Sequence, residues 1–196
     1  MNTKDKGDIF ELEVLELLKE EVASGRMSLI PNNVRIYNNK GYYSRDREKN
    51  IIVDISIEVW PPNSENYSVL IVIECKALSR CVPVDDLEEF KAKLDQIGGK
   101  NIKGIVITKN SFQSGSETYA KNQGIGLARV MPNNQVSWLM HMASSILMKP
   151  EEIKLQDVSD ALANESYHAK DCDFFSVYES NYFVSLPDLF NDVLSK

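Results

Sequence analysis

Hydrophobic and polar positions alternate regularly along the first two thirds of the chain. Residues 5–24 carry apolar side chains at the three- and four-residue spacing of an amphipathic helix. Residues 50–60 alternate apolar and polar side chains, the pattern of a half-buried strand. Residues 69–77 begin with an unbroken aliphatic run, which is typical of a strand buried on both faces. The turn-forming stretch PPNSENYS, residues 61–68, joins these two strands, so we expect an antiparallel hairpin.

The next part of the chain alternates helix and strand. Apolar spacing predicts a helix over residues 84–97, with Asp85 as its N-cap and a Gly-Gly pair just after it. Short aliphatic runs at residues 103–108 and 125–130 predict strands, and residues 114–124 predict a short helix between them. This order predicts an α/β domain with a mixed central sheet flanked by helices.

From residue 136 onward the pattern is weaker. It predicts helices over residues 136–148 and 151–165, a small hairpin over 174–186 and a closing helix over 187–194. We therefore divide the chain into a main domain, residues 1–135, and a small α+β C-terminal extension, residues 136–196. The pattern leaves open whether this extension packs on the core of the main domain.

The composition is that of an ordinary globular protein, with 43% hydrophobic and 26% charged residues in a chain of 196. No apolar run approaches the ~20 residues of a membrane helix, and the N-terminus lacks the apolar core of a signal peptide. We therefore expect a cytoplasmic protein without a membrane partner. The cysteines and histidines share no zinc-like spacing; they are Cys75, Cys81, Cys172, His141 and His168.

The net charge of −7 is unusual for a nucleic-acid-binding protein, but one segment departs from it. Residues 32–50 hold five cations against two acids, a local charge of +3, interleaved with tyrosines. Such a segment fits a solvated hairpin or loop as well as a surface that contacts phosphates. The candidates for DNA contact are Arg35, Lys40, Arg45, Arg47 and Lys49, with Lys109, Ser111 and Gln113 as weaker candidates after the strand at 103–108.

Charged side chains end the aliphatic strand. Glu74 and Lys76 lie two positions apart, so they project from the same face. A hairpin register that buries the aliphatic faces brings Asp54, on the preceding strand, beside Glu74. Two adjacent carboxylates repel each other unless a cation neutralises them, and their oxygens suit Mg²⁺ or Mn²⁺ rather than zinc. Glu11, on or beside the buried face of the first helix, adds a third acid.

Each of these residues also has an ordinary structural interpretation. Glu74 and Lys76 can form an ion pair at a sheet edge, while Asp54 and Glu11 can cap backbone groups. The Glu-x-Lys pattern recurs at Glu89 and Glu152, within predicted helices whose charged faces are solvated. The first occurrence differs because it closes a buried strand, and the combination of three acids and one lysine favours a metal-dependent site.

Over roughly residues 4–130 the chain resembles the PD-(D/E)XK nucleases, and in particular the Mrr-type restriction endonucleases. Asp54 stands where the motif has its first acid, with Val53 in place of the proline, and Glu74-Cys75-Lys76 stands as the (D/E)XK element. The segment KGDIFE, ending in Glu11, is similar to a helix signature of this branch, and residues 103–127 resemble the second half of its core.

This resemblance implies a restriction-endonuclease-like three-layer core that hydrolyses DNA phosphodiester bonds with Mg²⁺ or Mn²⁺. Glu11, Asp54, Glu74 and Lys76 would be catalytic. Asp54, Glu74 and the backbone carbonyl of Cys75 would hold the metal ion. Glu11 would hold a second ion or fix a metal-bound water, and Lys76 would orient water or stabilise charge on the phosphate. Lys93 and Gln96, on the following helix, are secondary candidates facing either the site or solvent.

The function that follows is an endodeoxyribonuclease acting on double-stranded DNA in restriction or defence. Two alternatives remain: a catalytically silent nucleic-acid-binding or sensor module of the same fold, and a nuclease for RNA or branched DNA. The sequence also leaves open a homodimer and a companion protein subunit.

Overall fold

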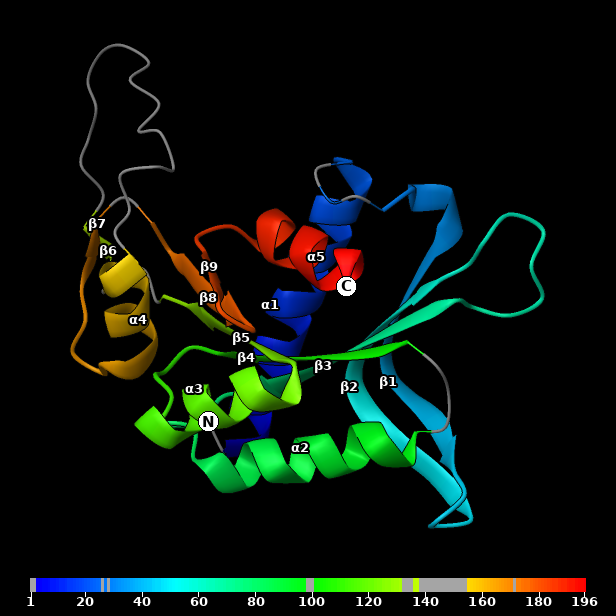
Figure 1. The fold of residues 1–196 in the computed structure, drawn as a ribbon, viewed down its shortest axis with the longest axis horizontal. Coiled ribbons are helices and arrows are strands. Elements are labelled where there is room, and N and C mark those ends of the chain that lie inside the picture. The colour runs from blue at the N-terminus through cyan, green and yellow to red at the C-terminus, as the bar shows by residue number, and fades with distance from the viewer. Residues whose placement is uncertain are drawn as a thin grey trace.

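Seven strands form one mixed sheet at the centre of the computed structural model (Figure 1). The structure describes residues 3–25, 27, 29–97, 101–131, 136–137, 155–170 and 172–196. The strands of this sheet lie in the order β1 (Val34–Ser44), β2 (Lys49–Val59), β3 (Val69–Lys76), β4 (Ile102–Thr108), β5 (Ile125–Val130), β8 (Phe174–Tyr178) and β9 (Asn181–Phe183). Strands β1 to β3 are antiparallel, β3 to β5 are parallel, and β8 and β9 return antiparallel. The predicted mixed sheet is therefore confirmed.

Helices cover both faces of this sheet. Helices α1 (Thr3–Ala23) and α5 (Leu186–Ser195) pack on one face. Helices α2 (Val84–Gln96), α3 (Ser114–Gln123) and α4 (Leu155–Ala163) pack on the other face (Figure 1). A short 3₁₀ helix, η1 (Pro31–Asn33), precedes β1. The result is the three-layer α/β core that the sequence predicts.

Helix α2 shows how closely the layers approach. Its inner stripe of Leu87, Phe90 and Leu94 is buried against the sheet. A Cβ added to Gly104, on β4, would lie 2.4 Å from Leu94 Cδ1, so only glycine allows this contact. The helix starts after Pro83 without a side-chain cap, so the predicted N-cap role of Asp85 is wrong. Asp85 lies in the first turn instead, where its negative charge interacts favourably with the positive end of the helix dipole.

The C-terminal residues share the central sheet. Strand β8 pairs with β5, β9 pairs with β8, and α5 belongs to the same buried apolar cluster as α1. The helix expected over residues 136–148 lies mostly outside the described residues. Its two described residues form β6 (Val136–Ser137), which pairs with β7 (Ala169–Lys170) rather than entering a helix. No helix in the described parts of the chain is long and apolar enough to cross a membrane.

Candidate active site

Asp54 lies where β2 changes the face that it buries. Ile51 and Val53 pack into the cluster beneath α2, whereas Ile55 and Ile57 pack into the cluster beneath α1. A regular strand would keep these alternate residues on one face. The single alternating face expected over residues 50–60 is therefore wrong at this point, and β2 has a kink at Asp54.

The neighbouring strand is irregular at the same level. The register pairs Asn38 with Ile55 and Lys40 with Val53, which leaves Asn39 opposite Asp54. Asn39 has a φ of 52°, in the left-handed region that an asparagine tolerates better than most residues. The two irregular residues thus mark one bend across the hairpin.

The bend folds the hairpin back on itself. In the register, Tyr42 lies opposite Ile51, five residues from Ser56. Five residues of flat strand span about 16 Å, which is farther than a tyrosine side chain reaches. Nevertheless, the Tyr42 hydroxyl lies 2.8 Å from both Ser56 Oγ and Glu58 Oε1. The strong curvature of β1 and β2 is visible in Figure 1.

Asp54 is held against the end of β3. The backbone N–H of Cys75 donates a hydrogen bond to Asp54 Oδ2 at 2.8 Å. Burial raises the pKa of Asp54, and the charge of Glu74 raises it further, while the Cys75 N–H, Lys93 and Lys76 act in the opposite direction. The two acids expected to lie side by side are therefore close enough to repel each other.

Glu74 is the most enclosed acid of this group, with a side chain only 7% exposed. Its Oε1 lies 3.1 Å from Lys76 Nζ and 3.0 Å from Lys93 Nζ. Its Oε2 is buried and has no hydrogen-bond partner in the part of the chain that the structure describes. Burial lowers the pKa of Lys93, but its contacts with Glu74 and Glu89 outweigh this effect and raise it overall.

Glu11 reaches the same centre from α1. Burial raises the pKa of Glu11, and the charges of Asp54, Asp8 and Glu74 raise it further. A hydrogen bond from the Asn39 side chain acts in the opposite direction. Three acids and two lysines are therefore gathered around the kink of β2 and the end of β3.

The donor chemistry of this centre fits a hard divalent cation. Within the described ranges, no three His, Cys, Asp or Glu side chains form a group that could hold a metal ion by themselves. Mg²⁺, however, is commonly bound by one or two carboxylates and completes its shell with waters and substrate phosphates. Asp54 and Glu74 supply two carboxylates, and the buried Glu74 Oε2 is an acceptor that needs a positive partner. The backbone of Cys75 lies between them.

Two of the cations proposed for DNA contact have partners within the protein. The Arg35 guanidinium lies 3.9 Å above the ring of Trp60. Lys40 Nζ lies 2.6 Å from Glu58 Oε1 and 3.6 Å from the ring centre of Tyr37. These contacts tie Arg35 and Lys40 to the folded hairpin, so they are poor candidates for binding phosphates.

The other three cations of this segment are exposed around the hairpin turn. Arg45 and Lys49 are exposed, and Arg47 donates from Nε to Gln96 Oε1 at 2.7 Å. This contact also places Gln96 at the surface rather than among the acids. In the sequence, residues 32–50 form one basic segment. In the structure its cations form two groups, one bonded within the fold and one exposed at the hairpin turn.

The contacts of the weaker candidates are with residues other than Glu11, Asp54 and Glu74. Lys109 pairs with Glu13 and lies 5.1 Å from the ring centre of Phe10. Gln113 is exposed just before α3, and Ser111 is buried with its hydroxyl 3.3 Å from Cys81 Sγ.

Two features of the centre escaped the sequence analysis. Lys93 was only a secondary candidate because a helical lysine can face either way, and its contact with Glu74 arises from tertiary packing. Asn39 was not singled out at all. Its left-handed φ and its hydrogen bond to Glu11 cannot be predicted from the sequence, because Asn39 lies in a segment rich in polar residues.

The histidines and the other two cysteines do not join these acids. His168 is exposed near Ser166, and His141 lies outside the described residues. Cys81 and Cys172 are free thiols elsewhere in the fold.

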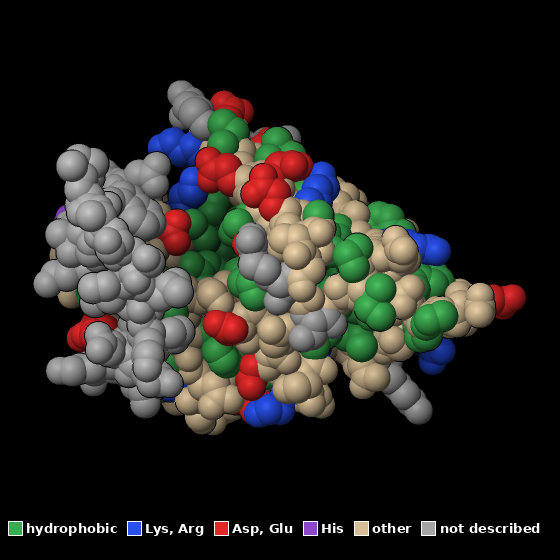
Figure 2. Space-filling model, turned by 90° about the horizontal axis from the view of Figure 1, so that it is seen from above, with side chains coloured by type: hydrophobic (Ala, Val, Ile, Leu, Met, Phe, Trp, Pro, Cys, Tyr) green, Lys and Arg blue, Asp and Glu red, His purple; other side chains and the backbone are tan. Residues whose placement is uncertain are grey.

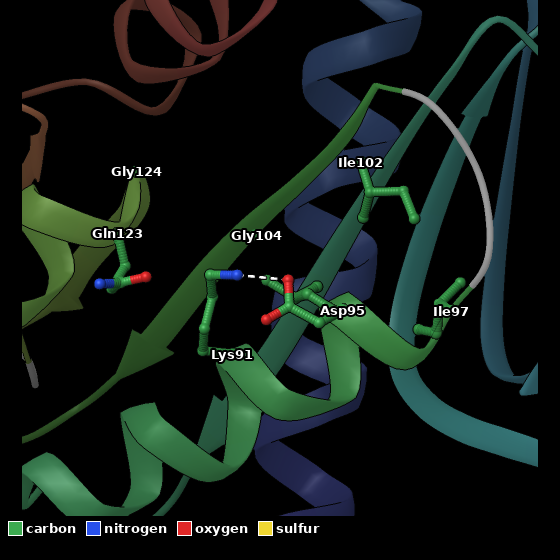
Figure 3. Close-up of a pocket in the computed structure, with 8 residues that line it drawn as sticks. Lys91, Asp95, Ile97, Ile102, Gly104, Gln123 and Gly124 are labelled. Carbon is green, nitrogen blue, oxygen red and sulfur yellow. Dashed lines mark hydrogen bonds and ion pairs between the residues drawn. The ribbon is translucent and has the colours of Figure 1, made fainter. Parts of the chain in front are cut away.

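A separate groove of about 310 Å³ lies between α2, β4 and the end of α3 (Figure 3). Its wall combines Leu94, Ile97 and Ile102 with the ion pair of Lys91 and Asp95. None of the acids of the candidate site lines it.

Figure 2 shows a further face, seen from above, on which acidic and basic side chains of the described residues are mixed without a continuous basic field. Neither feature competes with the acid cluster as the reactive centre.

Comparison with known proteins agrees with this geometry. Residues 34–130 match the profile of a restriction endonuclease family. The match includes Asp54, Glu74 and Lys76, but it begins after the end of α1, so it does not contain Glu11. No curated protein and no solved structure matched the chain.

Proposed function

Because residues 34–130 belong to the Mrr-type restriction endonuclease family, we propose that the protein is a metal-dependent endodeoxyribonuclease. Its substrate is double-stranded DNA, its cofactor is Mg²⁺ or Mn²⁺, and its biological role is restriction or defence against foreign DNA. The reaction is hydrolysis of a phosphodiester bond, in which water replaces one ester oxygen on phosphorus.

One observation carries most of the proposal. Asp54 and Glu74 meet at the kink of β2, and the Glu74 carboxylate has one oxygen buried without a hydrogen-bond partner among the described residues. A protein that only had to fold would gain nothing by placing like charges there, because their repulsion opposes folding. A divalent cation would relieve that repulsion and satisfy the orphaned oxygen.

The roles of the residues follow from their positions. Asp54 and Glu74, with the carbonyl of Cys75, would hold the cation, which supplies Lewis-acid stabilisation of the phosphate. Lys76, with its ammonium 3.1 Å from Glu74 Oε1, can donate to a phosphate oxygen or orient the attacking water. Glu11 would hold a second ion or orient water from the α1 side. The hydrogen bond from the Cys75 N–H holds the Asp54 carboxylate in place at the kink.

The test is a plasmid-cleavage assay on the whole protein with Mg²⁺ or Mn²⁺, with EDTA as the metal-free arm. We expect nicking or linearisation that requires metal and is lost in Glu74→Gln and Lys76→Met. The matched control is Glu16→Gln with Lys19→Met, because this ion pair lies on the exposed side of α1, away from Glu11, with side chains 63% and 48% exposed. That double variant should cleave like the wild type.

Circular dichroism and melting temperatures must show that all variants are folded. Cleavage that persists in EDTA or in Glu74→Gln would refute the metal-dependent mechanism. A folded wild type that cleaves no plasmid, modified DNA included, but still binds DNA would favour a silent binding module. Parallel assays on RNA and branched DNA separate the remaining alternative.

A further inference from the structure

Beyond the kink, the β1–β2 hairpin has a buried face and an unusually apolar exposed face. We call residues 39–54 the hairpin arm. On its inner face, Tyr42, Ile51 and Val53 are buried in the cluster beneath α2. On its outer face, Tyr43 is 59% exposed and Ile52 is 57% exposed. They are two of the five large hydrophobic side chains that are exposed in the described residues.

The register places this apolar pair together. Tyr43 lies opposite Asn50, and Ile52 lies opposite Gly41. Because paired residues and residues two apart share a face, all four belong to one face of the arm. A Cβ on Gly41 would lie 3.2 Å from Ile52 Cδ1, so the Ile52 side chain leans across the glycine. The outer face is therefore a low ridge formed by Ile52 and Tyr43.

This ridge is continuous with the candidate active site. Ile52 is two residues from Asp54, and Gly41 is two residues from Asn39, which bonds to Glu11. In the other direction the arm ends at the exposed Arg45, Arg47 and Lys49. The five residues from Asp54 to Lys49 span about 16 Å of strand. Since phosphates along one DNA strand advance about 3.4 Å per nucleotide, the turn lies about five nucleotides from the reacting phosphate.

We infer that the hairpin arm inserts into the major groove of the duplex, where Tyr43 and Ile52 contact base edges while Arg45, Arg47 and Lys49 bind the flanking phosphates. A two-stranded ribbon has dimensions that the major groove admits, and apolar side chains there contact thymine methyl groups. This inference rests on the proposed function, because it assumes that duplex DNA is the substrate.

The features of the arm favour DNA over a protein partner. The three exposed cations outnumber Asp46 and Glu48, the acids of the same turn, so the turn as a whole is positive. Arg35 and Lys40 are engaged within the fold, which leaves the turn as the exposed basic part of this segment.

The experiment measures binding of the whole protein to a labelled 30-base-pair duplex by fluorescence anisotropy, at several salt concentrations. Ca²⁺ replaces Mg²⁺, and a gel verifies that the duplex stays intact. The test variant is the double substitution Tyr43→Ser with Ile52→Ser, and the phosphate variant is Arg45→Ala. The matched control is Ile30→Ser, whose side chain is 64% exposed but lies before β1 and outside the arm.

The two variants should weaken DNA binding in different ways. The double variant should bind about tenfold more weakly with an unchanged dependence of log Kd on log salt, because apolar contacts release no counterions. Arg45→Ala should lower that salt slope by about one, since it removes one phosphate contact. Ile30→Ser should bind like the wild type. All proteins should melt within about 2–4 °C of one another, because each substituted side chain is exposed and such changes alter stability by up to about 0.5 kcal/mol each.

Wild-type affinity in the double variant would overturn the arm as a DNA-contacting surface while leaving the nuclease function intact. A double variant that changes oligomeric state in light scattering would also overturn it, by assigning the ridge to contact between copies of the chain. A wild type that neither binds nor cleaves DNA would instead refute the proposed function itself.

Discussion

Replacing Asp54 by asparagine should abolish cleavage and at the same time stabilise the metal-free protein. The asparagine side chain keeps the shape of the aspartate and can still accept the hydrogen bond from the Cys75 N–H, which is 2.8 Å long. What it removes is a negative charge. Since burial and then Glu74 raise the pKa of Asp54, the ionised form is unfavourable in the folded protein. Removing the charge therefore favours folding.

The gain is limited by the groups that already offset the repulsion. The Cys75 N–H, Lys93 and Lys76 each favour the ionised aspartate. Substitutions that relieve such unfavourable groups in active sites typically stabilise a protein by about 0.5–2 kcal/mol. We expect about 1 kcal/mol, which corresponds to a rise of about 2–4 °C in Tm for a chain of this size.

The stability advantage of Asp54→Asn over the wild type should depend on pH. The pKa of Asp54 in the folded state lies above its ordinary value of 3.8, so the folded protein binds the proton more tightly than the unfolded chain. Stability is then lost as the pH rises from 3.8 through the folded pKa. Asparagine does not titrate, so the advantage of Asp54→Asn should be complete at pH 8 and should shrink on acidification toward 3.8.

Thermal melts from pH 8 to pH 4 in EDTA test this directly. Adding Mg²⁺ should raise the Tm of the wild type by mass action and leave Asp54→Asn unchanged. The control is Asp54→Ala, which leaves the Cys75 N–H without its acceptor and should be about 1–3 kcal/mol less stable than the asparagine variant. If Asp54→Asn melts at or below the wild type at pH 8 in EDTA, the acid is not held in an unfavourable charged state.

Three further substitutions test neighbouring parts of the centre. Lys76→Met should reduce cleavage by about 10²–10³-fold in a folded protein, as measured by single-turnover kinetics. Lys93→Met leaves Glu74 with one ammonium fewer and should lower stability by about 1–3 kcal/mol in urea unfolding. Lys91→Met, which removes only a pair with the exposed Asp95, should change it by less than about 1 kcal/mol. Glu58→Ala should destabilise by about 3 kcal/mol by chemical denaturation, because Glu58 is only 1% exposed and pairs with a lysine. Equal effects of Lys93→Met and Lys91→Met would show that the contact with Glu74 contributes nothing.

The elements of the main domain could be predicted because their signals are local. The aliphatic run of β3, the stripe of Leu87, Phe90 and Leu94 on α2, and the turn-forming stretch between β2 and β3 each follow from a few neighbouring residues. The proximity of Asp54 to Glu74 also follows from strand periodicity once the hairpin is assumed. The order of strands β1 to β5 then needs only short connections.

The kink at Asp54 could not be predicted because it depends on tertiary packing rather than on neighbouring residues. Residues 53–59 alternate so regularly that a flat strand is the simplest interpretation, and the switch of face between Val53 and Ile55 appears only when helices pack on both faces. Pairing of β8 with β5 is likewise non-local, because more than 40 residues separate their sequences. Helix packing also brings Lys93 to Glu74, which periodicity alone does not specify.

The polar side chains of the hairpin explain how the kink is maintained. Tyr42 and Lys40 lie on the arm side of the bend, and both donate to Glu58 on the other side, at 2.8 and 2.6 Å. The indole N–H of Trp60 donates to the second oxygen of Glu58. These bonds span the bend, so they hold its angle, and the position of Asp54 depends on that angle. Lys40, one of the candidates for DNA contact in the sequence, is therefore bonded within the fold, where it helps to place an acid of the candidate active site.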